Sequence, residues 1–303
     1  MDATSSNPTA ELLRALGVLA EAPGPHHRAL AQALGLSAPA TEEQWKVQFT
    51  EALVLRARPY ASIYLGAEGR LGGEARGRIA GFWHAIGATP APEPDHLPVL
   101  LAGHARLIEA SEEGARWMHA RRAFLHEHLM PWLPAWLERV RHWGPRIYAE
   151  WAELLLQALQ AEAHALGQPP HRLALHLRHA PALHNPQNEG LDALVESLLT
   201  PAVSGLILFQ DDLRQAAAEL GQGCPAGDRR AMLRGLIEQH ATAACRWLAG
   251  FASDRARRHR KWATLSATAS RHWSDRAAAS ARLLARLSSE ARAATPAPAD
   301  SAG

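Results

Sequence analysis

The chain has 303 residues, of which 47% are hydrophobic and 20% charged, so it carries enough apolar side chains for a sizeable core and lacks the composition of a disordered protein. Its formal net charge of +2 is the sum of two unlike parts, because residues 1–250 carry −4 and residues 251–303 carry +6. The two cysteines, Cys224 and Cys245, exclude a disulfide framework and a zinc ribbon. With no secretory leader and no apolar run long enough for a bilayer, the sequence predicts a cytoplasmic protein without stable membrane insertion.

Helix-forming residues dominate the chain. Ala, Leu and Arg are abundant, whereas Val and Ile, which strands prefer, occur only seven times each. Apolar residues recur with the helical period and never alternate convincingly with polar ones. We therefore predict an all-α fold, a compact bundle of about ten or more helices.

The first helices are bounded by recognisable start and stop signals. A helix is predicted at about 9–21 with Thr9 as its N-cap, and a second at about 26–34, before Gly35. Thr41 and Gln44 form a capping-box pattern that starts the next helix. A further helix ends at Gly87, and the Pro-rich stretch 88–94 is predicted to be an extended connector because proline disfavours helix at and before its position.

Further helices are predicted beyond the connector. They are placed from about 97 to 108, and at about 112–129, 131–141, 145–166, 191–199, 211–220, 228–258 and 264–289, with a long loop at 167–189. Four parts of the chain follow from these patterns: an N-terminal helical half (1–92), a C-terminal helical half (93–250), a basic helical extension (251–292) and a disordered tail (293–303). The spaced tryptophans Trp132, Trp136, Trp143 and Trp151 are interpreted as core.

No motif predicts catalysis. His126 with His128, and His176 with His179, lack the further ligands that a metal site needs, so surface or hydrogen-bonded histidines are the better interpretation. The glycine-rich segment 66–73 has neither the Lys-Ser/Thr ending nor the preceding strand of a nucleotide-binding loop. No nucleophile elbow is present. The sequence therefore predicts a protein that is not an enzyme.

A helix-turn-helix regulator is the alternative hypothesis. Residues 27–37 resemble the first helix and turn of that motif, but the helix that follows carries Glu42 and Glu43, which phosphate would repel. The basic run 255–261 is better interpreted as a solvated helix face. We therefore expect no nucleic-acid partner.

The connector is flanked by side chains that suit a ligand groove. Tyr60, Tyr64, Phe82 and Trp83 precede it, and Asp95 and His96 follow it. From the residues alone two interpretations stay open: Asp95 caps the next helix and His96 packs, or both belong to a binding groove of aromatic and polar groups.

Several short segments in and beyond this region show a family resemblance. They are PYASIYLG (59–66), GFWHAIG (81–87), EPDHL (93–97), HEHLMPWLPAW (126–136), YAEWAELL (148–155) and TPAVSGLIL (200–208). In order and spacing they resemble the TorD/DmsD/NarJ family of cytoplasmic redox-enzyme (molybdoenzyme) maturation chaperones, over about residues 10–250. The resemblance implies an all-α chaperone that binds the twin-arginine signal peptide and the apo catalytic subunit of a molybdoenzyme and holds them for cofactor insertion before export. We expect no stably bound cofactor, at most transient contact with molybdopterin guanine dinucleotide or GTP, and a monomer or domain-swapped dimer.

The predicted binding residues divide as such a peptide does, into a cationic end and an apolar stretch. The hypothesis assigns Glu93 and Asp95 to the arginine end and gives His96 the orientation of the connector. The complete predicted set is Tyr60, Tyr64, Phe82, Trp83, Glu93, Pro94, Asp95, His96, Leu97 and Leu101, of which Tyr64, Trp83, Leu97 and Leu101 are assigned to the apolar end.

Overall fold

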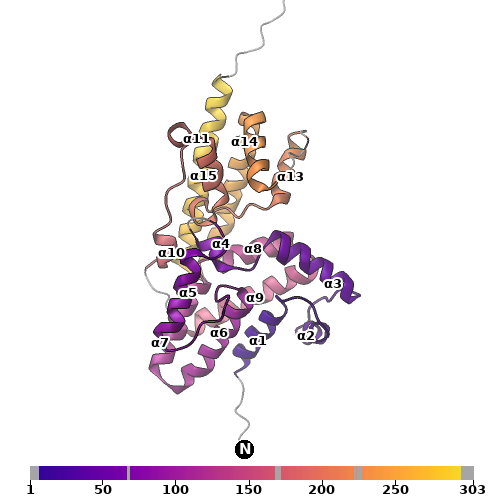
Figure 1. The fold of residues 1–303 in the computed structure, drawn as a ribbon, viewed down its shortest axis with the longest axis vertical. Coiled ribbons are helices and arrows are strands. Elements are labelled where there is room, and N and C mark those ends of the chain that lie inside the picture. The colour runs from indigo at the N-terminus through magenta and orange to yellow at the C-terminus, as the bar shows by residue number, and fades with distance from the viewer. Residues whose placement is uncertain (1–6, 67–68, 168–171, 222, 224–226, 295–303) are drawn as a thin grey trace, which may run out of the picture. The chain divides into compact units, whose positions relative to one another are not determined.

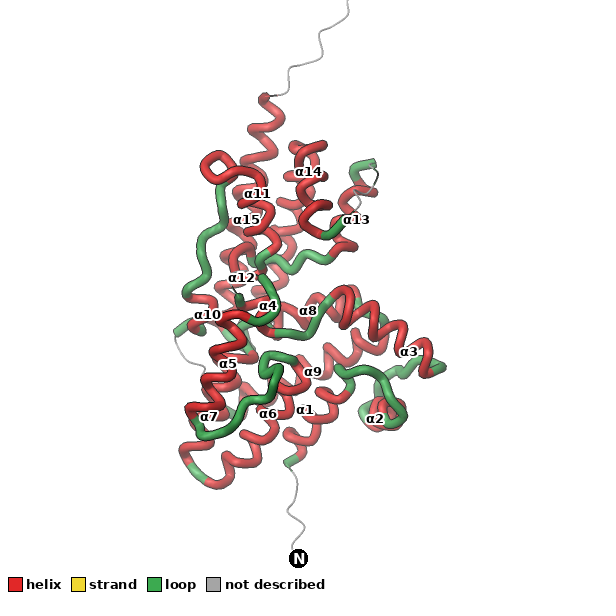
Figure 2. The backbone as a smooth tube through the Cα atoms, in the orientation of Figure 1, coloured by secondary structure: helices red, strands yellow, loops and turns green. Residues whose placement is uncertain are grey.

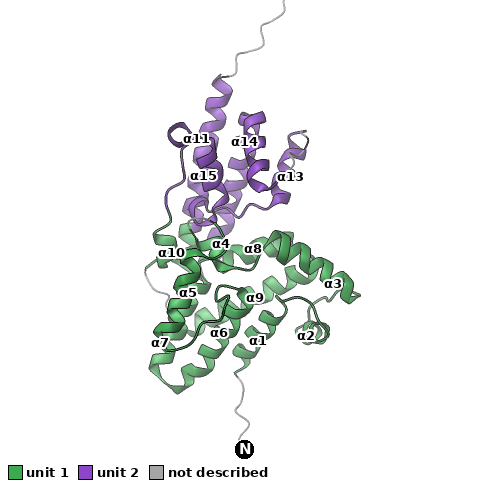
Figure 3. Cartoon of the chain, viewed as in Figure 1, with its two compact units in different colours: residues 1–180, 261–272 green, residues 181–260, 273–303 purple. Residues whose placement is uncertain are grey.

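The structure is a computed structural model that describes residues 7–66, 69–167, 172–221, 223 and 227–294. These residues form fifteen α-helices, three short 3-10 or π-helical segments and no β-strand, which confirms the all-α prediction (Figures 1 and 2). The chain divides into two compact units (Figure 3): unit 1 comprises residues 1–180 and 261–272, and unit 2 comprises 181–260 and 273–303. The prediction treats 1–92 and 93–250 as halves of one domain, and the unit boundaries do not coincide with its predicted end at 250/251.

Unit 1 contains the connector and most of the helices. In chain order its elements are α1 (Pro8–Val18), α2 (His27–Ala33), α3 (Glu42–Phe49), the π-helical η1 (Thr50–Arg56), α4 (Ala61–Leu65), α5 (Gly73–Ala85), α6 (Leu97–Ala110), the 3-10 segment η2 (Ser111–Glu113), α7 (Ala115–Phe124), the π-helical η3 (Leu125–Leu129), α8 (Leu133–Trp143), α9 (Arg146–Ala165) and α10 (Leu175–Arg178). The short α10 lies within the stretch predicted to be loop.

Local signals explain most of the helix ends in unit 1. The predicted cap Thr9 is wrong, because the side chain of Asn7 caps α1 by accepting from the amides of Thr9 (3.1 Å) and Ala10 (3.4 Å). The Thr41 hydroxyl accepts from the amide of Gln44 at 3.1 Å, as the capping pattern predicts. After α2 and α5 the chain turns at glycines with positive φ, Gly35 and Gly87, which confirms both predicted stops.

Helices α1, α6, α8 and α9 form the centre of unit 1. Helix α1 packs against α6 and α9, and α8 packs against α9 (Figure 1). Trp132, Trp136 and Trp151 are almost completely buried, as predicted, whereas Trp143 is half-buried. The indole of Trp151 donates to the Leu16 carbonyl at 2.9 Å, which satisfies its polar edge inside the core.

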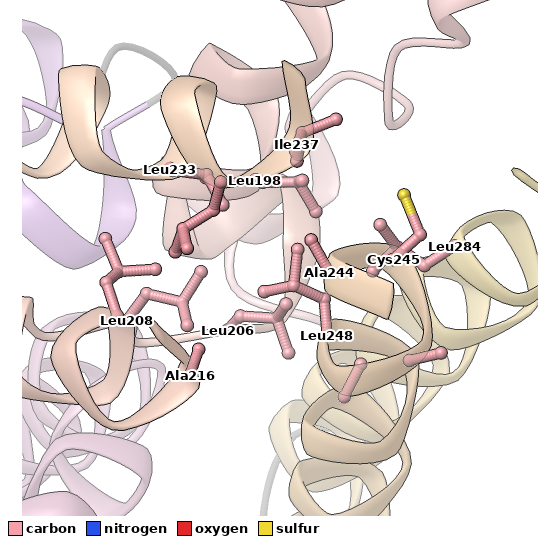
Figure 4. Close-up of a cluster of buried hydrophobic side chains, with 14 of the residues drawn as sticks. Leu198, Leu206, Leu208, Ala216, Leu233, Ile237, Ala244, Cys245, Leu248 and Leu284 are labelled. Carbon is pink, nitrogen blue, oxygen red and sulfur yellow. The ribbon is translucent and has the colours of Figure 1, made fainter. Parts of the chain in front are cut away.

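Unit 2 is a separate helical unit with its own core. Its elements are α11 (Pro186–Leu199), α12 (Pro201–Ser204), α13 (Gln210–Glu219), α14 (Arg229–Arg260) and most of α15 (Ala267–Ala294). Leu198, Leu206, Leu233 and Leu248 lie in one buried cluster together with Leu284 of α15 (Figure 4). The left-handed Gly205 (φ 71°) is required at the end of α12, because a Cβ there would lie 2.4 Å from the backbone nitrogen of Ala277.

The basic segment 251–292 is helical, as predicted, but it is part of unit 2 rather than an addition to it. Helix α14 runs through residue 250 without interruption, and Ala252, Ala277 and Leu284 belong to the same buried cluster as Leu198. Of the predicted disordered tail, residues 293 and 294 complete α15 and the remainder lies outside the described residues. No helix in the described part of the chain is both long and apolar enough to cross a bilayer.

Candidate functional site

The connector pairs with the chain that leads into α4. The Ala61 amide donates to the Asp95 carbonyl at 2.9 Å, and the Leu97 amide donates to the Pro59 carbonyl at 2.8 Å. Between these bonds Tyr60 and His96 form an isolated antiparallel bridge. Two of the segments singled out in the sequence, 59–66 and 93–97, therefore lie side by side, and the backbone fixes their register.

Asp95 is committed to an internal ion pair. Its carboxylate is fully buried, accepts from the Ser62 hydroxyl, and pairs with the Arg76 Nε at 2.7 Å. The Ser62 oxygen in turn accepts from the Gly72 amide at 2.9 Å. The N-cap of α6 is His96, without a side-chain capping bond, so Asp95 does not cap that helix. Because both oxygens have partners, the carboxylate positions the connector and is not presented to a peptide.

Three predicted residues form a partly exposed surface on the connector, which we call the connector face: Tyr60 and His96, which are half-buried, and Glu93, which is exposed. The Tyr60 hydroxyl donates to Glu93 Oε2 at 3.0 Å, and its ring stacks on His96 with centroids 4.6 Å apart. Burial, and then the bond to Glu93, raise the pKa of Tyr60. Burial lowers the pKa of His96, so the imidazole is neutral at pH 7. The face thus presents one carboxylate beside two neutral rings.

Most of the predicted apolar residues belong to the core. Leu97 and Leu101 are fully buried and Pro94 is buried. Tyr64 is 3% exposed, stacks on Trp132 with centroids 5.4 Å apart, and donates to the Arg58 carbonyl at 2.8 Å. These side chains shape the frame that holds the connector, and without a rearrangement they do not contact a ligand.

Trp83 is also buried, at 8% exposed, but it lines a pocket. This pocket, which we call the indole–acid pocket, has a volume of about 710 Å³ and lies between α5, the C-terminal end of α6, η2 and α7. Its walls include two indoles, two aliphatic side chains, three carboxylates and one guanidinium: Trp83, Trp117, Ile86, Leu107, Glu109, Glu112, Glu113 and Arg106. Of these only Trp83 belongs to the predicted set.

Comparison with known proteins identifies this region of the chain. Residues 18–138 match the family model described as nitrate reductase delta subunit. Over these residues, about two fifths of the chain, the sequence is similar to that family. No curated protein matches the chain.

The family match agrees with the resemblance seen in the sequence and supports a maturation chaperone for a molybdoenzyme. In this delta-subunit segment lie all ten predicted binding residues and every wall residue of the indole–acid pocket named above. Helices α9 to α15, and so all of unit 2, lie outside the match.

A buried ionic cluster joins the matched segment to α9. Glu162 of α9, just outside the match, accepts from His104 Nε2 at 2.8 Å and from the Arg121 Nε (2.7 Å) and Nη2 (2.6 Å). Burial raises the pKa of the Glu162 carboxyl, but its bonds from His104 and Arg121 outweigh that effect and lower it to about 2. The carboxylate is 1% exposed, so this cluster ties α6, α7 and α9 together and is closed to a ligand.

Two buried histidines, His126 and His128, lie in the π-helical η3, and a third, His176, lies in α10. Burial lowers the pKa of His126 and His176 to about 4 and that of His128 to about 3. His126 and His128 are over nine-tenths buried and so do not lie at the surface, and His126 Nε2 and His128 Nδ1 find no hydrogen-bond partner within the described ranges. Residues two apart point to different sides of the helical turn, and both rings are buried because η3 is covered on more than one side.

A second pocket of about 710 Å³ lies beside His126. It is lined by polar side chains such as Gln157, Gln160 and Thr264 together with small and apolar residues, and its described walls include no Lys or Arg side chain of the kind that phosphate groups need. In the described part of the chain, no three His, Cys, Asp or Glu side chains are placed to hold a metal ion.

Proposed function

We propose that the protein is a chaperone that binds the twin-arginine signal peptide of the catalytic subunit of a molybdopterin-containing oxidoreductase and holds the apo-subunit for cofactor insertion before export. The family match supports the chaperone class. The observation that carries the finer proposal is the indole–acid pocket, because it combines carboxylates for guanidinium groups with indoles for an apolar stretch.

The electrostatics of the pocket favour a cationic peptide. Its named walls carry three carboxylates against one guanidinium, and Glu112 and Glu113 are exposed. A carboxylate binds a guanidinium through two parallel hydrogen bonds, which an ammonium cannot match. The half-buried indole of Trp117 adds apolar contact and cation–π attraction, and the small exposed part of Trp83 adds apolar contact. An arginine-bearing segment with apolar neighbours therefore fits this lining.

The structure changes the proposed arginine end. Asp95 is occupied by Arg76, so we assign the arginine pair to the carboxylates of the pocket, Glu109, Glu112 and Glu113, and keep Glu93 as a second contact. The connector face lies at the N-terminal end of α6 and the indole–acid pocket at its C-terminal end. Helix α6 has 14 residues, so its ends are roughly 20 Å apart. About six extended residues span that distance, so one peptide can reach both surfaces.

Calorimetry with a synthetic peptide that carries an Arg-Arg pair followed by a Leu/Ala stretch tests this proposal. We expect the double variant Glu112→Gln/Glu113→Gln to weaken binding by about tenfold or more, because each charge-assisted hydrogen bond contributes about 1.5–3 kcal/mol. Glu43→Gln, at an exposed acid in the first turn of α3, is the matched control and should leave the affinity unchanged.

A second peptide sharpens the test. Replacing the Arg-Arg pair by Lys-Lys keeps the charge but removes the fork geometry, so the unaltered protein should bind it more weakly. Equal affinity of the unaltered protein for both peptides, together with no loss of affinity in the double variant, would show that the pocket does not recognise the arginine pair.

A further inference from the structure

Two of the recognition groups in the indole–acid pocket already hold arginines of the chain itself. Arg14 of α1 binds Glu109 with two parallel hydrogen bonds, Nη1 to Oε1 and Nη2 to Oε2, each 2.5 Å long. The guanidinium of Arg116 lies 5.2 Å from the ring centroid of Trp117 and donates from Nη2 to the Ile86 carbonyl at 3.0 Å. Thus one carboxylate and one indole of the pocket each contact a guanidinium in the free protein.

We infer that Arg14 and Arg116 occupy, in the free protein, the contacts that arginines of the client peptide make in the complex. Peptide binding then replaces the chain's guanidinium groups with those of the peptide. The inference rests on the proposed function and adds to it that two arginine side chains of the chain itself compete with the peptide for the pocket. The two contacts reproduce the two ways in which a pocket recognises arginine, a bidentate carboxylate pair and a stack on an indole.

Exposure makes these contacts exchangeable. The side chains of Arg14 and Glu109 are 40% and 38% exposed, and Arg116 is exposed on α7. Ion pairs and cation–π contacts in such surroundings contribute little to stability, so a second guanidinium can replace them at small cost. By contrast, the carboxylate that Arg76 binds is fully buried, so the Arg76–Asp95 pair is not available for exchange.

Charge balance also favours an exchange over a simple addition. Arg14 pairs with Glu109, and Arg106 and Arg116 bring two further positive charges near the pocket, so its surroundings carry as many guanidinium groups as its walls carry carboxylates. A dicationic peptide that entered without displacing them would meet like charges. When the two side chains move out to solvent, the Glu109 carboxylate and the Trp117 indole are left for the peptide.

Calorimetry with the Arg-Arg peptide tests the exchange. Removing a competitor should tighten binding, so we expect Arg116→Ala and Arg14→Ala each to raise the affinity by about two- to fivefold. Arg106→Ala is the matched control, because Arg106 lines the same pocket and makes no ion pair or ring stack within the described residues. Its removal changes the charge equally, so any gain there measures long-range attraction alone.

Salt separates the two effects. At about 1 M salt the Debye length falls to about 3 Å, so the Arg106→Ala gain should vanish while the Arg116→Ala gain remains. Equal gains in these two variants at both salt concentrations would overturn the inference, as would weaker binding by Arg116→Ala than by the unaltered protein. If the unaltered protein binds the peptide but no variant binds it more tightly, the inference alone fails. If neither the unaltered protein nor any variant binds it, the proposed function fails as well.

Discussion

Gly103 is a helix-interior glycine at which we expect alanine to destabilise the protein. A Cβ at this position of α6 would lie 2.5 Å from Cζ2 and 2.9 Å from Cη2 of Trp83. The indole is rigid and 8% exposed, and its ring packs against Phe82 and Phe124 with centroids 5.4 and 5.0 Å away, so it must move as a whole. Alanine gains about 1 kcal/mol of helix propensity, whereas overpacking costs about 1–3 kcal/mol. The expected net change is a loss of up to about 2 kcal/mol.

Urea unfolding of Gly103→Ala beside Gly81→Ala measures this balance. Gly81 lies inside α5 and a Cβ there meets nothing within 4 Å, so its alanine should stabilise the protein by about 0.5–1 kcal/mol. The double variant Trp83→Phe/Gly103→Ala should be less destabilised than the two single changes predict, because the smaller ring leaves room for the methyl group. A Gly103→Ala protein as stable as Gly81→Ala would refute the close packing of Trp83 on α6.

Three further predictions follow from buried charge, buried histidine and the course of α14. Asp95→Asn should cost about 3 kcal/mol in urea unfolding, because it leaves the guanidinium of Arg76, which is 28% exposed, without its counter-charge; an unchanged midpoint would contradict the ion pair. The free energy of unfolding should fall as the pH drops below about 6.5 and go on falling to about pH 4. The reason is that His126, His128 and His176 have lowered pKa values in the folded protein, so at these pH values they bind protons only in the unfolded chain. Urea midpoints that stay level from about pH 7 to about pH 5 would refute this. Deleting residues 251–303 removes Ala252, Ala277 and Leu284 from the unit 2 core, so limited proteolysis should cut readily within 181–250; resistance there would show that the segment is an accessory.

The fold was predictable because its signals are local. Composition and periodicity predict helices at nearly every place where the structure has one, and Gly35 and Gly87 mark helix ends through their own backbone preference. The two π-helical segments were not predictable, since packing rather than any residue type creates them. The placement of residues 251–292 in unit 2 was missed because charge was used to divide the chain, whereas the small buried residues of α14 and α15 decide the packing.

The candidate site was predictable only in part, because an aromatic or acidic residue beside an irregular connector has two possible uses. Tyr64 and Asp95 stabilise the fold around the connector. Tyr64 stacks on Trp132 in the core, and Asp95 pairs with Arg76 of α5, 19 residues earlier in the chain. Glu93 is exposed to solvent, and Trp83, although only 8% exposed, lines the indole–acid pocket. Sequence spacing does not separate these cases, since burial depends on which helices come together. Trp117 was missed for the same reason, as nothing near it in the chain indicates that α7 faces α5.

The internal arginines bear on how such a pocket would gain specificity. Only two of the 32 basic residues are lysines, so nearly every cation of this chain is itself an arginine. A pocket that recognises guanidinium in such a protein meets competition from its own side chains, and Arg14 and Arg116 show where. A client with one arginine gains little by replacing an equivalent internal contact. A client with two adjacent arginines replaces both contacts for a single loss of translational freedom, which is the advantage of bivalent binding. Competition from Arg14 and Arg116 would therefore favour peptides with two adjacent arginines over peptides with a single arginine.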